Sequence, residues 1–332
     1  MNHRRLGRTG LKVSEIGLGT MTFAGQCDEA TSHQILDTAT ERGVTLIDTA
    51  DVYPIPPAPE TSGRTEEVIG RWLERKGGRD RFVIATKCRL RVGHGPNDQG
   101  LSRRHILAAC EASLRRLKIE AIDLYQSHMP DPETPIDETL RAFDDLVRTG
   151  KVRYVGCSNY ASWELALALG TSERARIARY DSVQPRYNLL YREIETDLLP
   201  LCRDQGVGVI VYNPLAGGLL SGKHRPDQPP PPGTRFTLGD SGKLYRDRYW
   251  QSAQFEAVET LRQVCQKRGL SLATLSVAWV LSHPEISSAI VGASRPEQLI
   301  ETLAATDLTV DDELRETCES LWWILPRRPA SR

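Results

Sequence analysis

The sequence feature that most constrains the fold is an alternation between short apolar runs and helical patterns. Eight runs rich in β-branched and aliphatic residues recur along the chain. They lie at 15–18, 44–47, 82–85, 122–125, 152–155, 181–183, 207–211 and 288–291. Continuous apolar runs of this length are typical of strands buried on both faces, as in a parallel sheet. Eight such strands alternating with helices predict an α/β fold, and a (β/α)8 TIM barrel rather than an open sheet.

The segments between the runs contain helices with recognisable ends. Ser102 precedes one, and Thr134 is expected to cap another that begins at Pro135 and ends before Gly150. Alternating residues on either side of a turn predict an N-terminal β-hairpin, at about 3–13, that closes the bottom of the barrel. We therefore expect residues 1–332 to form a single barrel domain, with a C-terminal helix and tail at about 311–332.

Two long segments without a clear pattern follow the third and the seventh predicted strands, at about 90–100 and 216–250. Long structureless loops in a compact domain are usually lids or binding loops. Both follow strands, so both belong at the C-terminal face of a barrel, where barrel enzymes place their active sites. The pair Trp322–Trp323 near the C-terminus either shapes the same pocket or packs a terminal helix.

Composition excludes several classes of function. The 43 basic and 43 acidic residues balance, which argues against a nucleic-acid partner or a membrane surface. The small basic groups at 103–105 and 326–328 are interpreted as a solvated face and a terminus. No apolar run has the length of a signal peptide or a membrane span. Seven scattered cysteines without a C-x-x-C pair indicate a reducing, cytoplasmic location and no metal site.

Polar residues stand at the ends of three successive predicted strands. Asp48 ends the second strand, Lys87 ends the third, and His128 follows the fourth, while Tyr53 lies in the loop that leaves the second. Neighbouring strands lie ~4.8 Å apart, so these side chains should converge on one mouth of the barrel. Each residue alone has an ordinary structural explanation. Together, at four matched positions, they predict a catalytic group.

The segment that carries Asp48 and Tyr53 resembles the signature of the aldo-keto reductases. It reads Gly-Val-Thr-Leu-Ile-Asp-Thr-Ala-Asp-Val-Tyr over residues 43–53. Further segments resemble later motifs of the same family, in the same order and with similar spacing, between about residues 3 and 305. They lie at 84–87, 123–128, 156–160, 184–188, 212–218 and 291–298. The proline-rich insertion at 54–61 resembles the bacterial branch near the potassium-channel β-subunits.

The resemblance implies reduction of an aldehyde or ketone, a small-molecule carbonyl substrate, with hydride from NADPH (NADP+ in the reverse sense). Tyr53 would donate the proton to oxygen. Lys87 beside it would lower the pKa of the phenol, and Asp48 would pair with Lys87 and keep it charged. His128 would donate a hydrogen bond that orients the carbonyl.

The cofactor contacts are carried over from the family position by position. The resemblance implies that these residues line the cofactor site: Thr20, Met21, Asp48, Ser158, Asn159, Gln184, Tyr212, Asn213, Pro214, Leu215, Ala216, Gly217, Lys223, Arg235, Gly292, Ser294, Arg295, Gln298 and Glu301. Ser294 should cap a helix whose first turn holds Pro296, and Arg295 should bind the 2′-phosphate. The Gly17–Thr20 segment lacks the third glycine of a Rossmann fingerprint and is interpreted as a strand-end turn.

Some residues depart from the family pattern, and two other functions stay open. Met21 stands where many relatives have Trp, and Thr302 stands where Asn is common. Gly292 occupies a position that is basic in some branches. These differences leave the shape of the substrate and the tightness of the adenosine pocket less defined. One alternative is a nucleotide-sensing regulatory or binding protein with slow turnover. The other is a class I aldolase with Lys87 as Schiff-base nucleophile, against which the cofactor motifs argue. The sequence names neither the substrate nor the oligomeric state.

Overall fold

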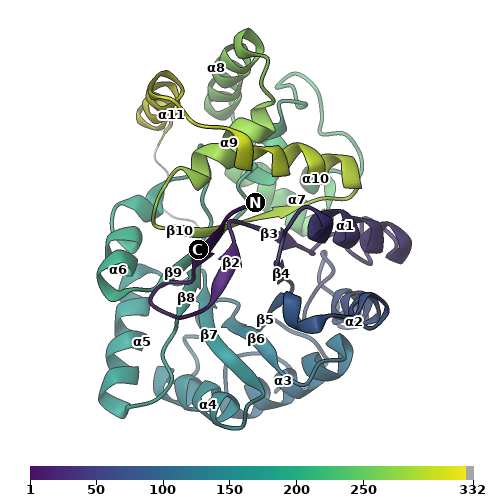
Figure 1. Ribbon diagram of the computed structural model, residues 1–332, viewed down its shortest axis with the longest axis vertical. Helices are drawn as coiled ribbons and strands as arrows, with labels where there is room; N and C mark the ends of the chain where they lie inside the picture. Colours follow the sequence, from purple (N-terminus) through teal and green to yellow (C-terminus); the bar gives the residue numbers. More distant parts are fainter. Residues whose placement is uncertain (327–332) are drawn as a thin grey trace.

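The computed structural model describes residues 1–326 and contains a closed barrel of eight parallel strands (Figure 1). Around the barrel the order is β10, β3, β4, β5, β6, β7, β8 and β9, and each strand pairs in parallel with its neighbours. The strands are β3 (Ile16–Gly19), β4 (Leu46–Asp48), β5 (Val83–Cys88), β6 (Ile122–Ser127), β7 (Val152–Ser158), β8 (Ser182–Gln184), β9 (Gly208–Tyr212) and β10 (Ile286–Gly292). The predicted TIM barrel is therefore confirmed.

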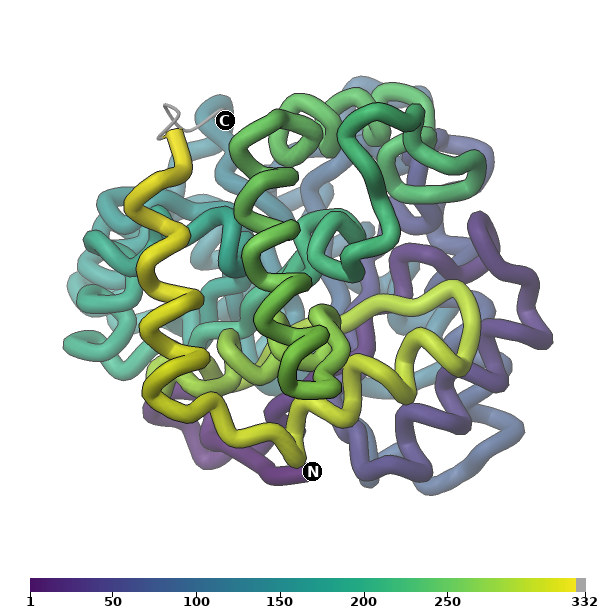
Figure 2. Tube along the Cα trace, turned by 90° about the horizontal axis from the view of Figure 1, so that it is seen from above, coloured from purple at the N-terminus to yellow at the C-terminus, as the bar shows by residue number. Residues whose placement is uncertain are grey.

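Helices surround the barrel and cover the outer face of its sheet (Figure 1). Those that follow the strand–helix alternation are α1 (Glu29–Glu41), α2 (Arg64–Lys76), α3 (Arg103–Leu117), α4 (Ile136–Arg148), α5 (Ser162–Ala175), α6 (Leu198–Gln205), α9 (Leu272–Leu281) and α10 (Pro296–Leu303). The additions to this pattern are α7 (Gly239–Tyr249), α8 (Ser252–Arg268) and α11 (Asp312–Ile324). Figure 2 shows α8 and α11 side by side along one flank of the molecule.

The predicted N-terminal hairpin is confirmed and closes the amino-terminal end of the barrel. It consists of β1 (His3–Arg5) and β2 (Lys12–Ser14), which pair antiparallel. Leu6 and Val13 are fully buried against the apolar side chains inside the barrel. The Arg4 guanidinium donates to the carbonyl oxygens of Leu281 and Ile286, just before and at the start of β10. Figure 2 shows the hairpin, in purple, at the bottom of the molecule.

The barrel interior is apolar near this end and polar near the other. Its apolar layer is formed by Leu46, Val83, Ala85, Leu124, Ile210 and Ile290. Alternate residues of a strand share one face, so the positions two residues farther along point into the same interior. Those positions are Asp48, Lys87, Gln126 and Tyr212. The apolar layer thus forms the floor beneath a polar site at the carboxyl ends of the strands.

Gly17 and Gly19 lie inside β3 because no larger residue fits there. A Cβ atom at Gly17 would lie 2.6 Å from Ile290 Cδ1, and one at Gly19 would lie 2.7 Å from Ile290 Cγ2. The glycines therefore let β10 and β3 pack closely inside the barrel. The predicted strand-end turn over Gly17–Thr20 is wrong, since the segment continues β3 to Gly19.

Two predicted helix caps are also wrong. Thr134 does not cap α4: Pro135 is the N-cap residue, and the Thr134 hydroxyl donates to Asp131 Oδ2 at 2.8 Å. Ser294 lies one residue too early to cap α10, and both its N–H and its hydroxyl donate to Gln298 Oε1. In both cases the hydroxyl that was expected to cap the helix instead donates to a nearby side-chain oxygen.

The long segment after β9 contains secondary structure, contrary to the prediction of a structureless loop. We call residues 216–250 the strap. The strap includes short 3₁₀ turns, Ala216–Ser221 and Arg235–Thr237, followed by α7. The buried face of α7 consists of Gly242, Tyr245 and Tyr249. Because that face starts with a glycine and carries no aliphatic residue, the sequence gives little sign of it.

The C-terminal helix α11 packs against the body of the protein and does not reach the cavity described below. Trp322 is partly buried against the core, whereas Trp323 is 72% exposed. Packing is therefore the role of this part of the chain, and it does not shape a pocket. The basic group expected at 326–328 lies outside the described residues from 327 onward.

The cysteines and helices show neither disulfides nor membrane-spanning segments within residues 1–326. All seven cysteines are free and buried, as expected of small core residues. Within residues 1–326, no helix has the length and apolar character needed to cross a bilayer. The same residues contain no cluster of three or more His, Cys, Asp or Glu side chains that could hold a metal ion.

Candidate active site

A cavity of about 760 Å³ opens at the carboxyl ends of the barrel strands, between the barrel and the strap. The predicted catalytic and cofactor residues line it with two exceptions, Lys87 and Ala216. Lys87 lies beneath the cavity floor, in contact with Asp48. Ala216, the first residue of the strap, is fully buried between the lining residues Leu215 and Gly217, and its contact with a cofactor stays a prediction.

The buried pair of Lys87 and Asp48 forms the base of the site. Lys87 is 1% exposed and Asp48 is 4% exposed. Lys87 Nζ donates to Asp48 Oδ2 at 2.5 Å and to the Thr49 carbonyl oxygen at 2.8 Å. A buried ammonium needs such partners because desolvation disfavours its charge. With its nitrogen bonded to two oxygens and outside the cavity lining, Lys87 is poorly placed to attack a substrate, which disfavours the aldolase alternative.

The second carboxylate oxygen of Asp48 is bound by two side-chain amides. Gln184 Nε2 donates to Asp48 Oδ1 at 2.8 Å, and Gln126 Nε2 donates to it at 3.3 Å. These bonds fix the plane of the carboxylate and therefore the position of Lys87. Sequence reasoning missed Gln126. It could have been found from the alternation of side chains along β6, because Gln126 lies two residues after the interior residue Leu124 and therefore on the same face.

Tyr53 and His128 face each other above this pair. Their ring centroids are 5.8 Å apart and the rings are nearly perpendicular, at 81°. Lys87 Nζ lies 5.5 Å from the centroid of the Tyr53 ring. Tyr53 is held by its loop, where its carbonyl oxygen accepts from the Gly63 N–H at 3.1 Å. A phenol, an imidazole and an ammonium therefore surround one corner of the cavity.

The electrostatics of Tyr53 differ from the sequence-based expectation. Burial raises the pKa of the Tyr53 phenol well above its usual value, and the charge of Asp48 raises it further. The expected lowering by Lys87 is therefore wrong for this arrangement. The reason is the short Lys87–Asp48 distance, since Asp48 largely cancels the field of the ammonium. The phenol consequently holds its proton at neutral pH.

His128 is neutral in this environment. Burial lowers the pKa of its imidazole well below the usual value, and the positive charges of Lys87 and Arg89 lower it further. Its Nδ1 atom is buried without a hydrogen-bond partner among the described residues. A neutral imidazole carries one N–H. If that proton is on Nε2, this nitrogen is a hydrogen-bond donor.

The polar residues expected at the nicotinamide end form a network of hydrogen bonds. The Ser158 hydroxyl donates to the Gln184 carbonyl oxygen at 2.7 Å, and Asn159 Nδ2 donates to Ser158 Oγ at 3.0 Å. The Tyr212 hydroxyl donates to Asn159 Oδ1 at 2.8 Å. Asn159 also has a left-handed backbone conformation, with φ 60°. These contacts hold amide and hydroxyl groups in a fixed order along one wall.

The far end of the cavity is cationic. Lys223 and Arg295 both line it, and burial together with the charge of Arg295 lowers the pKa of Lys223. Two cations that repel each other at one end of a cavity favour an anionic group between them. Glu301 also lines this end, where its carboxylate accepts from the Ser271 hydroxyl. Glu297 lies outside the cavity lining.

Comparisons with known proteins identify the family of this chain. Residues 15–322 match the model of the Aldo/keto reductase family. The uncharacterized oxidoreductase YrpG of Bacillus subtilis is 38% identical over 319 residues, which cover 95% of this chain and 94% of the relative. A probable voltage-gated potassium channel subunit beta of Arabidopsis thaliana is 35% identical over 340 residues, covering 100% and 99% of the two chains. Protein tas of Escherichia coli is 32% identical over 347 residues, covering 97% of each. The chain belongs to the aldo/keto reductase family.

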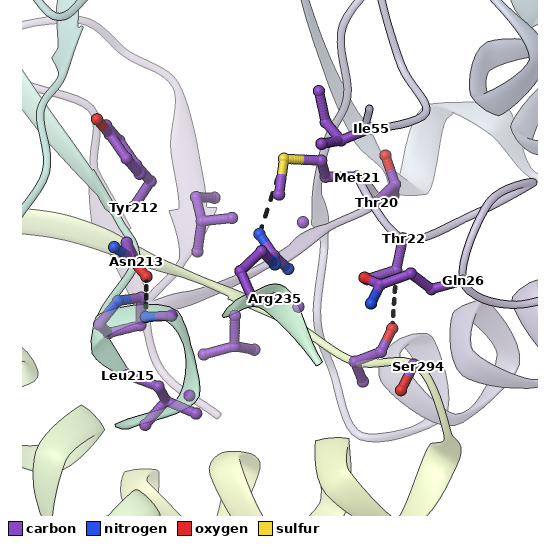
Figure 3. A pocket seen from close by; sticks show the side chains of 18 of the residues that line it. Thr20, Met21, Thr22, Gln26, Ile55, Tyr212, Asn213, Leu215, Arg235 and Ser294 are labelled. Carbon is purple, nitrogen blue, oxygen red and sulfur yellow. Dashed lines mark hydrogen bonds between the residues drawn. The ribbon is translucent and has the colours of Figure 1, made fainter. Parts of the chain in front are cut away.

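The aldo/keto reductases are a family of oxidoreductases. In this member of the family the strap crosses the cavity and is hydrogen-bonded to the opposite rim. Gln26 Nε2 donates to the Gly233 carbonyl oxygen at 2.8 Å. Arg235 Nη1 donates to Met21 Sδ at 3.8 Å and to the Tyr245 hydroxyl at 3.4 Å. Figure 3 shows Arg235 extending across the pocket toward Met21. Gln26 and Tyr245 were missed by sequence reasoning, because both lie in segments without a regular pattern.

An aromatic cluster anchors the strap of this aldo/keto reductase, with His224 at its centre. His224 is 3% exposed, and neither ring nitrogen has a hydrogen-bond partner among the described residues. Its ring packs edge-on against Phe236, at 5.0 Å, and Trp250, at 5.2 Å. Burial and, to a lesser extent, the charge of Lys223 lower the pKa of His224 to about 4. The cluster therefore requires a neutral imidazole.

We expect acid to weaken the fold through His224. The pKa is about 4 in the folded protein and about 6.5 in the unfolded chain, so the unfolded chain binds an extra proton between these values. Stability is therefore lost as the pH falls from about 6.5 to about 4, by roughly 3 kcal/mol at about 1.36 kcal/mol per pKa unit. Urea unfolding of wild type and His224→Phe at pH 7 and pH 4.5 measures this. A variant with the same pH dependence as wild type would contradict the assignment.

Proposed function

We propose that this protein is an NADPH-dependent carbonyl reductase that converts aldehydes or ketones to alcohols. The observation that carries the proposal is the buried Lys87–Asp48 pair beneath Tyr53, with His128 facing the phenol across the cavity corner. The family, the shape of the cavity and its cationic far end support it. Its site fits a long anionic cofactor, because amide and hydroxyl groups line one end and cations the other.

In the proposed reaction NADPH supplies the hydride that reduces the carbonyl carbon. Ser158, Asn159 and Gln184 would hold the nicotinamide amide, Tyr212 would stack on its ring, and Lys223 with Arg295 would bind phosphates. His128 would donate its N–H to the carbonyl oxygen and orient it. Tyr53 would then give its proton to the same oxygen as negative charge develops there.

The raised pKa of Tyr53 suits the role of proton donor. A phenol that keeps its proton is ready to donate at neutral pH, but it is a weak acid. Lys87 would assist indirectly, because its charge offsets that of Asp48, which would otherwise disfavour the phenolate left after proton transfer still more. The amides of Gln184 and Gln126 on Asp48 would keep the Lys87–Asp48 pair in place during this step.

Preference for NADPH over NADH is expected to depend on Arg295. This residue is the N-cap of α10 and lies close enough to Lys223 to lower its pKa. The planar guanidinium can donate to two phosphate oxygens at once. We expect Arg295→Ala to weaken NADPH binding by about 1.5–3 kcal/mol, the range for a charged hydrogen-bond partner, and to leave NADH binding nearly unchanged. Fluorescence titration of both cofactors measures this; equal losses would show that Arg295 does not bind the 2′-phosphate.

The activity itself is tested by incubating the protein with NADPH and a panel of aldehydes and ketones. We expect cofactor oxidation that depends on both the carbonyl compound and Tyr53. Binding of NADPH without measurable turnover on any carbonyl would instead favour a regulatory, nucleotide-sensing protein. That second candidate is favoured by the relative named as a potassium channel β-subunit, which matches this chain along its whole length.

A further inference from the structure

A second cavity, of about 660 Å³, lies at the amino-terminal end of the barrel strands, opposite the active site. We call it the basal cavity. Its walls come from α4, α5 and α6, which Figure 1 shows along one edge of the barrel, together with the first half of β7. The turn of the N-terminal hairpin completes it, since the Arg8 N–H donates to the Gly206 carbonyl oxygen at the end of α6, at 2.8 Å. The apolar interior of the barrel separates the two cavities.

The lining of the basal cavity is rich in arginine. Four guanidinium groups come from three segments, namely the hairpin turn, β7 and the loop after α5: Arg8, Arg153, Arg176 and Arg179. Two acidic residues, Glu173 and Asp181, share the cavity. Four guanidiniums thus face two carboxyl groups, and burial raises the pKa of Asp181 above its usual value. Positive charge therefore exceeds negative charge on these walls.

Three of these arginines have no carboxylate partner. Arg153 donates to Asp123 Oδ1 at 2.8 Å, but within the described chain no ion pair of 4.0 Å or less includes Arg8, Arg176 or Arg179. Arg179 Nη2 donates to the Gln205 carbonyl oxygen at 3.0 Å, whereas its Nε is buried without a partner. A buried, charged N–H without an acceptor is costly. An anion in the cavity would remove that cost.

Two of these arginines, the exposed Arg8 and the partly buried Arg179, also repel each other. Burial lowers the pKa of Arg179, and the nearby charge of Arg8 lowers it further. Asp181 and Glu173 offset only part of this charge. Two guanidiniums close together suit a phosphate, because each fork can donate to two oxygens. The remaining wall is apolar, with side chains from α4, α5 and α6 that include Val147, Leu169 and Leu201.

We propose that the basal cavity binds a small phosphate ester. The phosphate would lie between Arg8 and Arg179, with Arg176 at the rim, and the carbon part of the ligand would lie against the apolar wall. The volume is in the range of about 300–1,000 Å³ typical of small-molecule sites. This site does not depend on the function proposed for the active-site cavity.

The test is calorimetric titration of the full chain with phenyl phosphate, and with phenol as the ligand without phosphate. We expect saturable binding of phenyl phosphate and none of phenol. Arg179→Gln and Arg8→Gln should each raise the Kd about tenfold or more, as expected for the loss of a charged hydrogen-bond donor. Two controls remove the same charge elsewhere: Arg104→Gln on the surface of α3, and Lys223→Gln in the active-site cavity. Neither should change the Kd more than about twofold.

Several outcomes would overturn the proposal. These are no saturable binding to wild type, equal binding of phenol, or equal weakening by Arg104→Gln. Weakening by Lys223→Gln but not by Arg179→Gln would place the ligand in the active-site cavity instead. If Arg179→Gln does not fold, the affinity of Arg8→Gln, a variant in the exposed hairpin turn, tests the proposal. Arg179→Lys keeps the positive charge but loses the planar guanidinium, and it should bind phenyl phosphate with intermediate affinity.

Discussion

Tyr53→Phe is expected to lower kcat/KM for carbonyl reduction by a factor of about 10²–10⁴, the usual cost of losing a positioned acid. The ring stays in place against His128, 5.8 Å away between centroids, so the shape of the cavity should not change. The proton that the alkoxide needs is gone. Burial and Asp48 keep that proton on the wild-type phenol, and no other described hydroxyl faces His128 in this way.

The measurement is steady-state turnover together with NADPH affinity, read by intrinsic tryptophan fluorescence. Affinity should change less than about twofold, because the hydroxyl is not a proposed cofactor contact. Tyr154→Phe is the matched control, since Tyr154 lies on β7 and is not part of the cavity lining. Turnover near the wild-type rate in Tyr53→Phe would remove Tyr53 from the mechanism.

Lys87→Met should remove activity and also weaken the fold. Asp48 is 4% exposed, and breaking a buried ion pair by removing one partner typically costs about 3–5 kcal/mol. The amides of Gln184 and Gln126 remain on Asp48, so we expect the lower end of that range. The negative charge left near Tyr53 should raise the pKa of the phenol further, which makes proton donation slower.

A second variant separates the two effects of Lys87→Met. Adding Asp48→Asn removes the unpaired charge and should restore part of the free energy of unfolding, while activity stays absent. Lys267→Met on α8, an exposed position, controls for the loss of a lysine. Urea unfolding and turnover are measured on all three proteins. Wild-type activity in a folded Lys87→Met protein would contradict the assigned role. So would a loss of activity that is explained entirely by failure to bind NADPH.

The barrel and the placement of its site could be predicted because both follow from local patterns. Apolar runs gave the strands, and the residues at their ends, Asp48, Lys87 and His128, meet wherever parallel strands close into a barrel. Gln126 follows from the same period of two. The strap could not be predicted, because α7 buries Gly242 and two tyrosines, and such a face has no aliphatic repeat.

The direction of the pKa shift of Tyr53 also could not be predicted from the sequence. The residue types around Tyr53 suggested a lowered pKa, but the sign depends on distances. Lys87 lies 2.5 Å from Asp48 and 5.5 Å from the Tyr53 ring centroid, so the ammonium acts mainly on the carboxylate. The helix caps failed for a similar reason, since Thr134 and Ser294 had other partners within reach.

The central claim, that this cavity transfers hydride from NADPH to a carbonyl carbon, is tested most directly by following the hydride. NADPH deuterated at both positions of nicotinamide C4 is mixed with excess enzyme and 4-nitrobenzaldehyde, and the alcohol is analysed by mass spectrometry. The account predicts one deuterium in each alcohol molecule, one alcohol for each NADPH oxidised, and alcohol formed about 10²–10⁴ times more slowly with Tyr53→Phe. Alcohol without deuterium, or NADPH that binds and is never oxidised by any carbonyl compound, would contradict it.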